Sequence, residues 1–188
     1  GNKAANMSYG RSIRIATRPS LLSMAQANEL LVLLSSILCD ETFEIIPLAS
    51  EGDIKKQVSL KTLERGVFAK RIDGEADIAV HSAKDVPSDI PDGLAIAGYT
   101  RRLDARDVIV QREERSLDDL PRGFRLGTSS QRRSCQILNL RPDINIVPIR
   151  GNVDSRISLI EEGTVDGVVL GAAGLMRLGR LDDMSSFL

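Results

Sequence analysis

The sequence is poor in aromatic residues, histidine and cysteine, and each shortage argues against a class of site. Aromatic residues make up 3% of the chain and tryptophan is absent, so a nucleic-acid surface built on base stacking is not expected. A single histidine, His81, and two cysteines outside any CxxC pair leave too few ligands for a zinc site, and we expect no bound metal. Cys39 and Cys135 fall in apolar, helix-forming stretches, which is typical of buried thiols in a reducing cytosol.

Neither a surplus of one charge nor a long apolar run is present. The 25 basic and 26 acidic residues leave a net charge of −1, which excludes nucleic-acid or membrane binding by bulk electrostatics. The longest apolar stretch, residues 30–38, is too short to span a bilayer, and residues 1–10 lack the layout of a signal peptide. We interpret residues 1–10 as a tag or a disordered segment, and expect a cytoplasmic monomer whose anion sites are local clusters of Lys and Arg.

Strand and helix patterns alternate along the whole chain. Strands are predicted at 12–17, 43–48, 78–80, 94–97, 108–110, 124–127, 144–149 and 168–170. Helices are predicted at 21–38, from 131 to about 140, from 154 to 162 and after residue 174. This alternation predicts an α/β fold of two lobes, each with a mixed, largely parallel sheet flanked by helices. A change to charged residues near 100–106 places the boundary between domain 1 (11–100) and domain 2 (105–188).

Basic residues follow the predicted strands. The set is Arg18, Lys84, Arg132, Arg133, Arg150, Arg156 and Arg177. Because the carboxyl ends of parallel strands share one edge of a sheet, these side chains are expected to gather there, where α/β sheets bind ligands. With a hinge between the two lobes, the predicted site is a cleft that holds a small polyanion.

The stretch 128–130 (TSS) marks a helix start directly before Arg132 and Arg133. Thr128, Ser129 and Ser130 could simply cap the helix, but a helix start followed by two guanidinium groups also suits a bound carboxylate or phosphate. Residues 151–152 (GN) after Arg150 repeat this arrangement, with Asp154 or Ser155 as the expected cap and a plain tight turn as the alternative.

Asp85 follows Lys84 at the end of a predicted buried strand. A carboxylate among arginines remains ionised and can stabilise a cationic intermediate or transfer protons. The alternative is a loop aspartate paired with Lys84, which could itself be an ordinary surface lysine. His81 is interpreted as a buried, hydrogen-bonded residue rather than a catalytic one. The nucleotide-binding pattern GxxxxGK[ST], the dinucleotide fingerprint and the nucleophile elbow are all absent from the sequence.

Five motifs, in order and with closely matching spacing, resemble the porphobilinogen deaminase (hydroxymethylbilane synthase) family. They are 15–20 (IATRPS), 76–87 (ADIAVHSAKDVP), 127–133 (GTSSQRR), 150–156 (RGNVDSR) and 173–179 (AGLMRLG). The resemblance implies the two N-terminal domains of that family, with a fold similar to type II periplasmic binding proteins. It also implies condensation of four porphobilinogen molecules into the linear tetrapyrrole hydroxymethylbilane, with release of ammonia, in haem and tetrapyrrole biosynthesis.

The same resemblance assigns roles to the residues. It implies a dipyrromethane cofactor, on which the chain grows, and porphobilinogen and the growing oligopyrrole as partners. Asp85 is implied as the catalytic acid and Lys84 as a cofactor contact. The implied set that binds acetate and propionate groups, with supporting hydroxyls, is Arg18, Ser20, Thr128, Ser129, Ser130, Arg132, Arg133, Arg150, Arg156 and Arg177.

Several features depart from the family pattern. The family's third domain carries the cofactor cysteine, and we expect it to be missing because the sequence stops at Leu188, with neither Cys39 nor Cys135 in a matching position. The segment 69–75 is shorter than usual, and the glycine-rich loop before Phe68 is reduced to residues 64–66. We therefore expect this chain to be inactive alone. The alternative hypothesis is a two-lobed carboxylate-binding module without catalysis, for which Asp85 beside Lys84 would bring no benefit.

Overall fold

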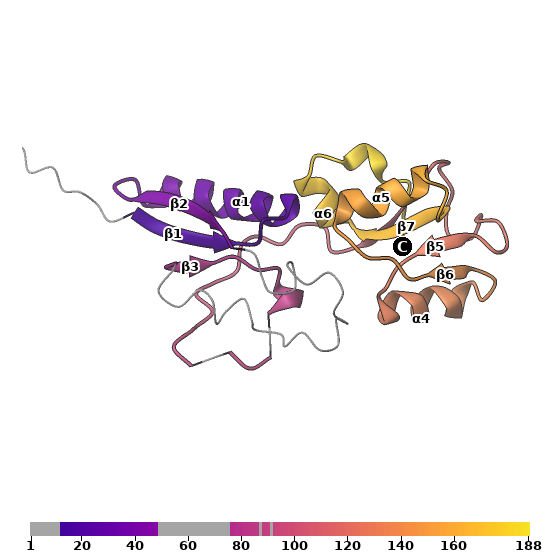
Figure 1. Ribbon diagram of the computed structural model, residues 1–188, viewed down its shortest axis with the longest axis horizontal. Coiled ribbons are helices and arrows are strands. Elements are labelled where there is room, and N and C mark those ends of the chain that lie inside the picture. Colours follow the sequence, from indigo (N-terminus) through magenta and orange to yellow (C-terminus); the bar gives the residue numbers. More distant parts are fainter. Residues whose placement is uncertain (1–11, 49–75, 87, 91) are drawn as a thin grey trace, which may run out of the picture. The chain divides into compact units, whose positions relative to one another are not determined.

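The chain divides into two compact units, residues 1–100 and 101–188. The computed structural model describes residues 12–48, 76–86, 88–90 and 92–188 (Figure 1). Predictions were made above for the segments 1–10, 64–66 and 69–75, which lie outside the described residues. Among the helices that are described, none is long and apolar enough to cross a membrane.

Unit 1 contains a three-stranded parallel sheet of order β2-β1-β3. The strands are β1 (Ser12–Thr17), β2 (Thr42–Pro47) and β3 (Ile78–Ala79), and β3 is followed by a short 3-10 turn, η1 (Ala83–Asp85). The central strand buries Ile15, Ala16 and Thr17 completely. All three carboxyl ends lie at one edge of the sheet, so the residues after β1 and after β3 share that edge.

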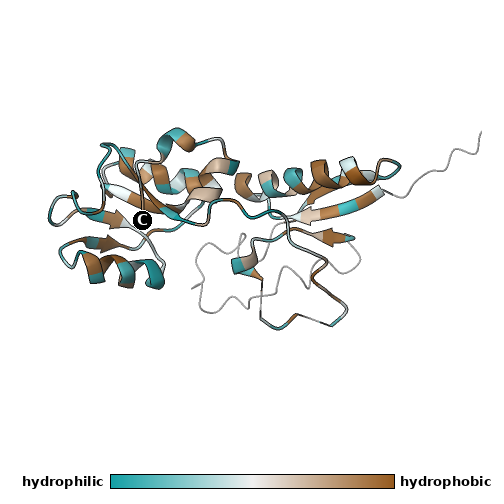
Figure 2. Ribbon diagram, turned by 180° about the vertical axis from the view of Figure 1, so that it is seen from behind, coloured by the Kyte–Doolittle hydropathy of each residue, from teal (hydrophilic) through white to brown (hydrophobic). Residues whose placement is uncertain are grey.

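Helix α1 (Leu21–Ile37) joins β1 to β2 and packs on both strands. Its start is capped by Ser20, whose hydroxyl accepts the backbone N–H of Ser23 at 3.2 Å. Apolar residues occur on several sides of the helix (Figure 2). Ala27 is completely buried, whereas Val32 and Ile37 are 68% and 65% exposed. The apolar composition of this helix therefore exceeds what its contact with the sheet buries.

Unit 2 contains a five-stranded mixed sheet of order β6-β5-β7-β4-β8. Strands β5 (Arg125–Gly127), β6 (Asn145–Val147) and β7 (Gly167–Gly171) are parallel to one another. Strand β4 (Asp107–Gln111) runs antiparallel to β7 and to β8 (Ser186–Phe187). The helices are α4 (Gln131–Leu140), α5 (Val153–Glu161) and α6 (Ala172–Arg177), and a 3-10 turn, η2 (Leu181–Asp183), follows α6.

The core of unit 2 lies on both faces of the sheet. Successive side chains of a strand point to opposite faces, so Val168 and Leu170 pack in one cluster and Val169 in the other. The first cluster includes apolar residues of α5 and α6, and the second includes Ile137 of α4. Helices α5 and α6 therefore cover one face and α4 the other, giving three layers (Figure 1).

Most predicted elements are confirmed, including β1 at both of its ends. The strand predicted at 94–97 is wrong: these residues form no strand, and Leu94 and Ile96 are 40% and 49% exposed. A strand requires a neighbouring strand with which to form hydrogen bonds, and the alternating pattern alone does not supply one.

The prediction of buried thiols is also wrong, because Cys39 and Cys135 are both exposed and free. Helix α1 ends at Ile37, so Cys39 lies beyond it. Cys135 lies two residues before the buried Ile137 of α4, about 200° around the helix from it.

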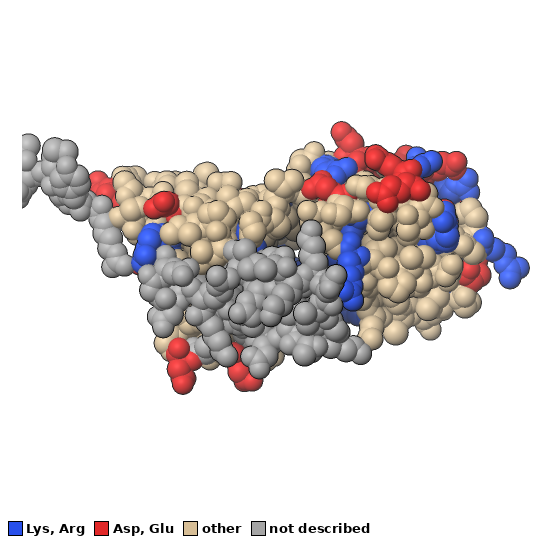
Figure 3. Space-filling view, viewed as in Figure 1, with Lys and Arg blue, Asp and Glu red and all other residues tan. Residues whose placement is uncertain are grey.

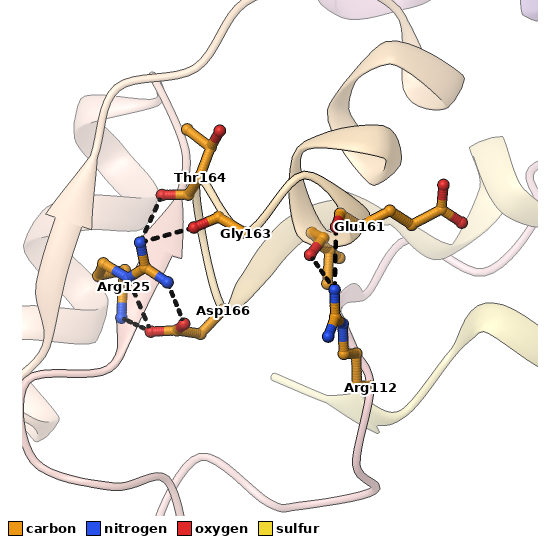
Figure 4. Close-up of polar contacts among 7 residues, drawn as sticks. Arg112, Arg125, Glu161, Gly163, Thr164 and Asp166 are labelled. Atoms are coloured by element: carbon orange, nitrogen blue, oxygen red, sulfur yellow. Dashed lines mark hydrogen bonds and ion pairs between the residues drawn. The ribbon is translucent and has the colours of Figure 1, made fainter.

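Several arginines of unit 2 bind backbone carbonyls of other segments and so have a structural role. Arg125 forms a two-pronged ion pair with Asp166 and donates to the carbonyls of Gly163 and Thr164, at 2.8 and 3.1 Å (Figure 4). Arg112 donates to the carbonyls of Ile160 and Glu161 at the end of α5, and the Ile160 carbonyl also accepts the Gly163 N–H at 3.1 Å. These arginines join the loops and helix ends to the sheet.

Arg141 makes a similar connection and predicts an acid-sensitive unit 2. It donates to both carboxylate oxygens of Asp143 at 2.8 Å and to the Leu117 carbonyl at 2.6 Å. The hydrogen bonds from Arg141 lower the pKa of Asp143 from 3.8 to about 2. A carboxyl group whose pKa is depressed on folding stabilises the fold above its unfolded value, and this contribution is lost as the pH falls toward the folded value.

We therefore expect the thermal midpoint of unit 2 to fall as the pH drops from 3.8 to about 2. Asp143→Asn should lower the midpoint at neutral pH and make the acid drop smaller. Thermal melting followed by circular dichroism over this range measures both, with the exposed Asp182→Asn as the control. An acid drop in Asp143→Asn equal to that of the unsubstituted chain would contradict the assignment.

Candidate functional site

The carboxyl ends of β5, β6 and β7 form one edge of unit 2. Because the three strands are parallel and adjacent, the loops that lead into α4, α5 and α6 all leave from this edge. Figure 3 shows a band of Lys and Arg side chains at the edge of unit 2 toward which the arrows of β5 and β6 point in Figure 1. We call the residues at this edge (128–133, 150–156 and 177, with Asp107) the strand-end site.

The loop at residues 128–130 is held by its own hydroxyl groups. Thr128 is 2% exposed, and its hydroxyl accepts the backbone N–H of Ser130 at 3.2 Å. Ser130 caps α4 by accepting the N–H of Arg133 at 3.4 Å, so the capping interpretation holds for this residue. Ser129 donates its hydroxyl to the Ile149 carbonyl and thereby ties the loop to the end of the β6 segment.

The glycines beside the loops permit close approach of the chain. A Cβ added to Gly127 would lie 2.9 Å from Cδ1 of Ile149 and 3.1 Å from Cγ1 of Val168, so a side chain there would force these neighbours to shift. Gly151 has a φ of +105°, and a Cβ on it would lie 2.9 Å from Cβ of Ser155. The turn before α5 therefore requires glycine. The Asn152 side chain caps the helix by accepting the Ser155 N–H at 2.8 Å, so the predicted cap at Asp154 or Ser155 is wrong.

Arg133 is held from two directions. Its Nε donates to Asp107 Oδ2 at 2.8 Å and its Nη2 donates to Oδ1 of the same carboxylate. Its Nη1 donates to the Val169 carbonyl at 3.3 Å, and 14% of its side chain is exposed. Asp107 had no signal in the sequence pattern, because only the antiparallel pairing of β4 with β7 brings this residue to the strand-end site.

Arg156 is a half-buried cation one turn into α5. Its Nε donates to the Gly151 carbonyl at 2.9 Å, and no carboxylate among the described residues forms an ion pair with it. Burial lowers the pKa of the Arg156 guanidinium, and the positive charge of Arg133 lowers it further. A desolvated cation near a second cation favours the binding of an anion.

Arg132 and Arg150 are exposed at the same edge. Their side chains form no hydrogen bond or ion pair with the described part of the chain, in contrast to Arg133. Arg177 lies partly buried in the last turn of α6. Among the predicted arginines of this unit, Arg132 and Arg150 are therefore available to a ligand, and Arg156 is a desolvated cation. Arg133 is already bound to a carboxylate.

The predicted residues of unit 1 lie at the corresponding edge of its own sheet. Arg18 follows β1 and is exposed, while Lys84 and Asp85 lie exposed in η1 after β3. The side chains of Lys84 and Asp85 form no ion pair with each other, so the alternative of a paired loop aspartate is wrong. Burial lowers the pKa of His81, against the raising effect of Asp85, and Arg18 lowers it further, so the charges of Asp85 and Arg18 both lie within electrostatic range of His81.

No cluster suited to a metal ion occurs in the described ranges of the chain. The donors at both edges are instead guanidinium, ammonium and hydroxyl groups, which bind carboxylates. The arrangement in unit 2 can bind carboxylates. Unit 1, taken by itself, presents an accessible carboxylate, Asp85, at the edge of its own sheet.

Comparisons with known proteins agree with this chemistry. Residues 13–188 match the family model described as "Porphobilinogen deaminase, dipyromethane cofactor binding domain". The porphobilinogen deaminase of Alkaliphilus metalliredigens is 42% identical over 187 residues, covering 95% of this chain and 58% of the relative. The probable porphobilinogen deaminase of Pyrobaculum neutrophilum is 45% identical, covering 88% of this chain and 58% of the relative. The chain therefore spans about three-fifths of the length of these relatives.

Solved structures show the same fold. A putative methionine-binding lipoprotein from Bacillus subtilis matches with a TM-score of 0.51 at 13% identity, covering 94% of this chain and 77% of that chain. The periplasmic VFT2 domain of BvgS from Bordetella pertussis matches with a TM-score of 0.50 at 17% identity, covering 94% and 75%. These likenesses confirm the predicted type II periplasmic-binding-protein-like fold.

Proposed function

This chain belongs to the porphobilinogen deaminase family, and we propose that it forms the substrate- and cofactor-binding part of a hydroxymethylbilane synthase. The whole protein would be a cytoplasmic, monomeric transferase of haem and tetrapyrrole biosynthesis. It condenses four porphobilinogen molecules into hydroxymethylbilane and releases ammonia. The observation that carries the proposal is Arg156, a desolvated cation beside Arg133 at an edge that also presents Arg132 and Arg150.

The donor set fits a dipyrromethane cofactor and an oligopyrrole. Each pyrrole of porphobilinogen carries an acetate and a propionate, so every added unit brings two carboxylates. Arg132, Arg150 and Arg156 would bind these groups through paired hydrogen bonds, and the fixed Arg133 has N–H groups left for the same ligand. When bound, the cofactor supplies the free pyrrole carbon from which the chain grows. Cys39 and Cys135 are not assigned as its attachment site.

Asp85 is proposed to act on the reacting pyrrole. Its exposed carboxylate accepts the pyrrole N–H and stabilises the positive charge that develops when the C–N bond of the aminomethyl group breaks and ammonia leaves. The free α-carbon of the growing oligopyrrole then forms the new C–C bond, and the α-proton is lost to a base. Arg18, Ser20 and Lys84 of unit 1, with Arg177 of unit 2, complete the proposed set of ligand contacts.

Titration calorimetry tests the binding part of the proposal. The chain is titrated with porphobilinogen, and separately with succinate and glutarate, which carry two carboxylates but no pyrrole. We expect porphobilinogen to bind more tightly than either diacid, and its affinity to fall with rising ionic strength. Equal affinity for all three would favour a carboxylate-binding module without catalysis, and absence of porphobilinogen binding would overturn the proposal.

The catalytic part is tested on the complete gene product that carries this chain. Incubation with porphobilinogen should produce a linear tetrapyrrole and one ammonia for each porphobilinogen consumed. Mass spectrometry identifies the tetrapyrrole and an enzymatic ammonia assay gives the ratio. Failure to form the tetrapyrrole when the cofactor is shown by intact mass to be attached would contradict the assignment.

A further inference from the structure

The ion pair between Asp107 and Arg133 is, with that between Arg141 and Asp143, one of the two most enclosed Arg–Asp pairs that the structure describes in unit 2. Their side chains are 24% and 14% exposed, against 36% and 40% for Asp166 and Arg125. Asp107 is the first residue of β4 and lies opposite Gly171, the last residue of β7. The Asp107 carboxylate therefore comes from β4, which is antiparallel to β5, β6 and β7. It meets Arg133 of α4 at the carboxyl ends of these three strands.

The contacts fix the plane of the Arg133 guanidinium as well as its position. One edge, Nε and Nη2, binds both oxygens of Asp107, and Nη1 donates to the Val169 carbonyl at 3.3 Å. A side chain held at both edges cannot rotate without breaking hydrogen bonds to a charged group. Arg156, by comparison, is held at Nε only, by the Gly151 carbonyl.

We propose that Asp107 is a positioning residue for carboxylate binding: it holds the Arg133 guanidinium in the orientation in which its remaining N–H groups bind a pyrrole carboxylate. This inference rests on the proposed function, because it takes porphobilinogen and its oligomers as the ligand. Asp107 is thereby assigned to the strand-end site, for which the sequence pattern predicted only basic and hydroxyl residues.

Asp107 also offsets one of two like charges. Arg133 and Arg156 lie within electrostatic range of each other, and the Asp107 carboxylate offsets the charge of Arg133 at hydrogen-bonding distance. Without it, both guanidinium groups would repel each other and turn toward solvent. The arrangement therefore orders two cations in a small volume before any ligand arrives, which reduces the ordering cost of binding.

The pair between Arg125 and Asp166 provides a matched control. It is also two-pronged, lies in the same unit and involves the first residue of β5, whereas the strand-end site lies beyond the last residue of β5 (Figure 4). Asp166→Asn thus removes one carboxylate from an ion pair of similar geometry, away from the strand-end site. If Asp107 served stability alone, the two substitutions would have the same consequences.

The experiment compares Asp107→Asn, Asp107→Glu and Asp166→Asn by calorimetry with porphobilinogen and with inorganic phosphate. We expect both asparagine variants to lower the thermal midpoint, and only Asp107→Asn to raise the Kd for porphobilinogen, by about tenfold. Phosphate, a small anion that needs no fixed spacing of cations, should bind to Asp107→Asn at least as tightly as before. Asp107→Glu keeps the charge but moves the carboxylate, and should weaken porphobilinogen binding by about threefold.

Nitrogen-15 NMR of the arginine side chains gives a readout that does not depend on the ligand. The Nε–H signal of Arg133 should be sharp in the unsubstituted chain and in Asp166→Asn, and broadened by solvent exchange in Asp107→Asn. An unchanged porphobilinogen Kd in Asp107→Asn, or tighter binding of both anions, would overturn the inference. If Asp107→Asn does not fold, unchanged porphobilinogen affinity in Asp107→Glu overturns it instead. An unsubstituted chain that binds no porphobilinogen contradicts the proposed function, while the NMR comparison still decides whether Asp107 orders Arg133.

Discussion

Asp85→Asn is expected to lower kcat of the complete gene product by at least about a hundredfold, the range that general acid–base groups contribute. The amide keeps the size of the side chain but removes the negative charge that would stabilise the cationic pyrrole as ammonia leaves. Because Asp85 is exposed and forms no ion pair with the described residues, its replacement should leave the thermal midpoint unchanged. The measurement is the initial rate of tetrapyrrole formation at saturating porphobilinogen, with the midpoint measured in parallel.

Asp89→Asn is the matched control, because Asp89 is also exposed and lies four residues further along the same loop. It should leave kcat within about twofold, as surface substitutions away from a site usually do. A normal rate in Asp85→Asn would remove this residue from the mechanism, and with it the main distinction between an enzyme and a simple carboxylate-binding module.

Arg156→Met is expected to have opposite effects on binding and on stability. Methionine retains much of the length of the side chain and removes the charge, so the Kd for porphobilinogen should rise by at least about thirtyfold. The pKa of Arg156 is lowered by burial and then by Arg133, which means that its charged form is disfavoured in the folded chain. Removing that charge should therefore leave the thermal midpoint unchanged or raise it. Calorimetry and thermal melting of the same protein sample measure both effects.

Arg112→Met serves as the control, because it is expected to lower stability and leave porphobilinogen binding unchanged. Arg112 donates to the carbonyls of Ile160 and Glu161 at the end of α5, so its loss should destabilise unit 2 by about 1 kcal/mol. It lies outside the strand-end site, and porphobilinogen binding should be unchanged. Loss of stability in Arg156→Met, with binding retained, would show that Arg156 is a structural arginine of the same kind as Arg112.

Local signals in the sequence were sufficient to predict most of the secondary structure. The alternation in residues 12–17 predicts β1 at both ends, because a strand next to a core shows its two faces directly in the sequence. Ser130 before α4 marks a helix start, because a capping side chain bonds the backbone only three residues away. Five ordered motifs were sufficient to identify the family, since they depend on residue type and spacing alone.

Features that depend on residues distant in the sequence were not predicted correctly from the sequence. The pattern at 94–97 predicted a strand, but no local signal shows whether a neighbouring strand is available. The two cysteines were predicted to be buried because their surroundings are apolar, whereas the end of α1 and the rotation of α4 leave them exposed. These errors concern burial and pairing, which are decided by contacts across the fold.

The same division applies to the strand-end site. Residue order alone shows that arginines follow the strands, that glycines and hydroxyl residues precede the helices, and that Asp85 is next to Lys84. Which of these side chains are available to a ligand depends on contacts made in the folded chain. Arg133 is bound to Asp107 because β4 runs antiparallel to β7. Arg156 forms no ion pair with a carboxylate among the described residues, and its Nε donates instead to the Gly151 carbonyl in the turn before α5. Charge is a property of a residue, but neutralisation of that charge depends on residues brought together by folding.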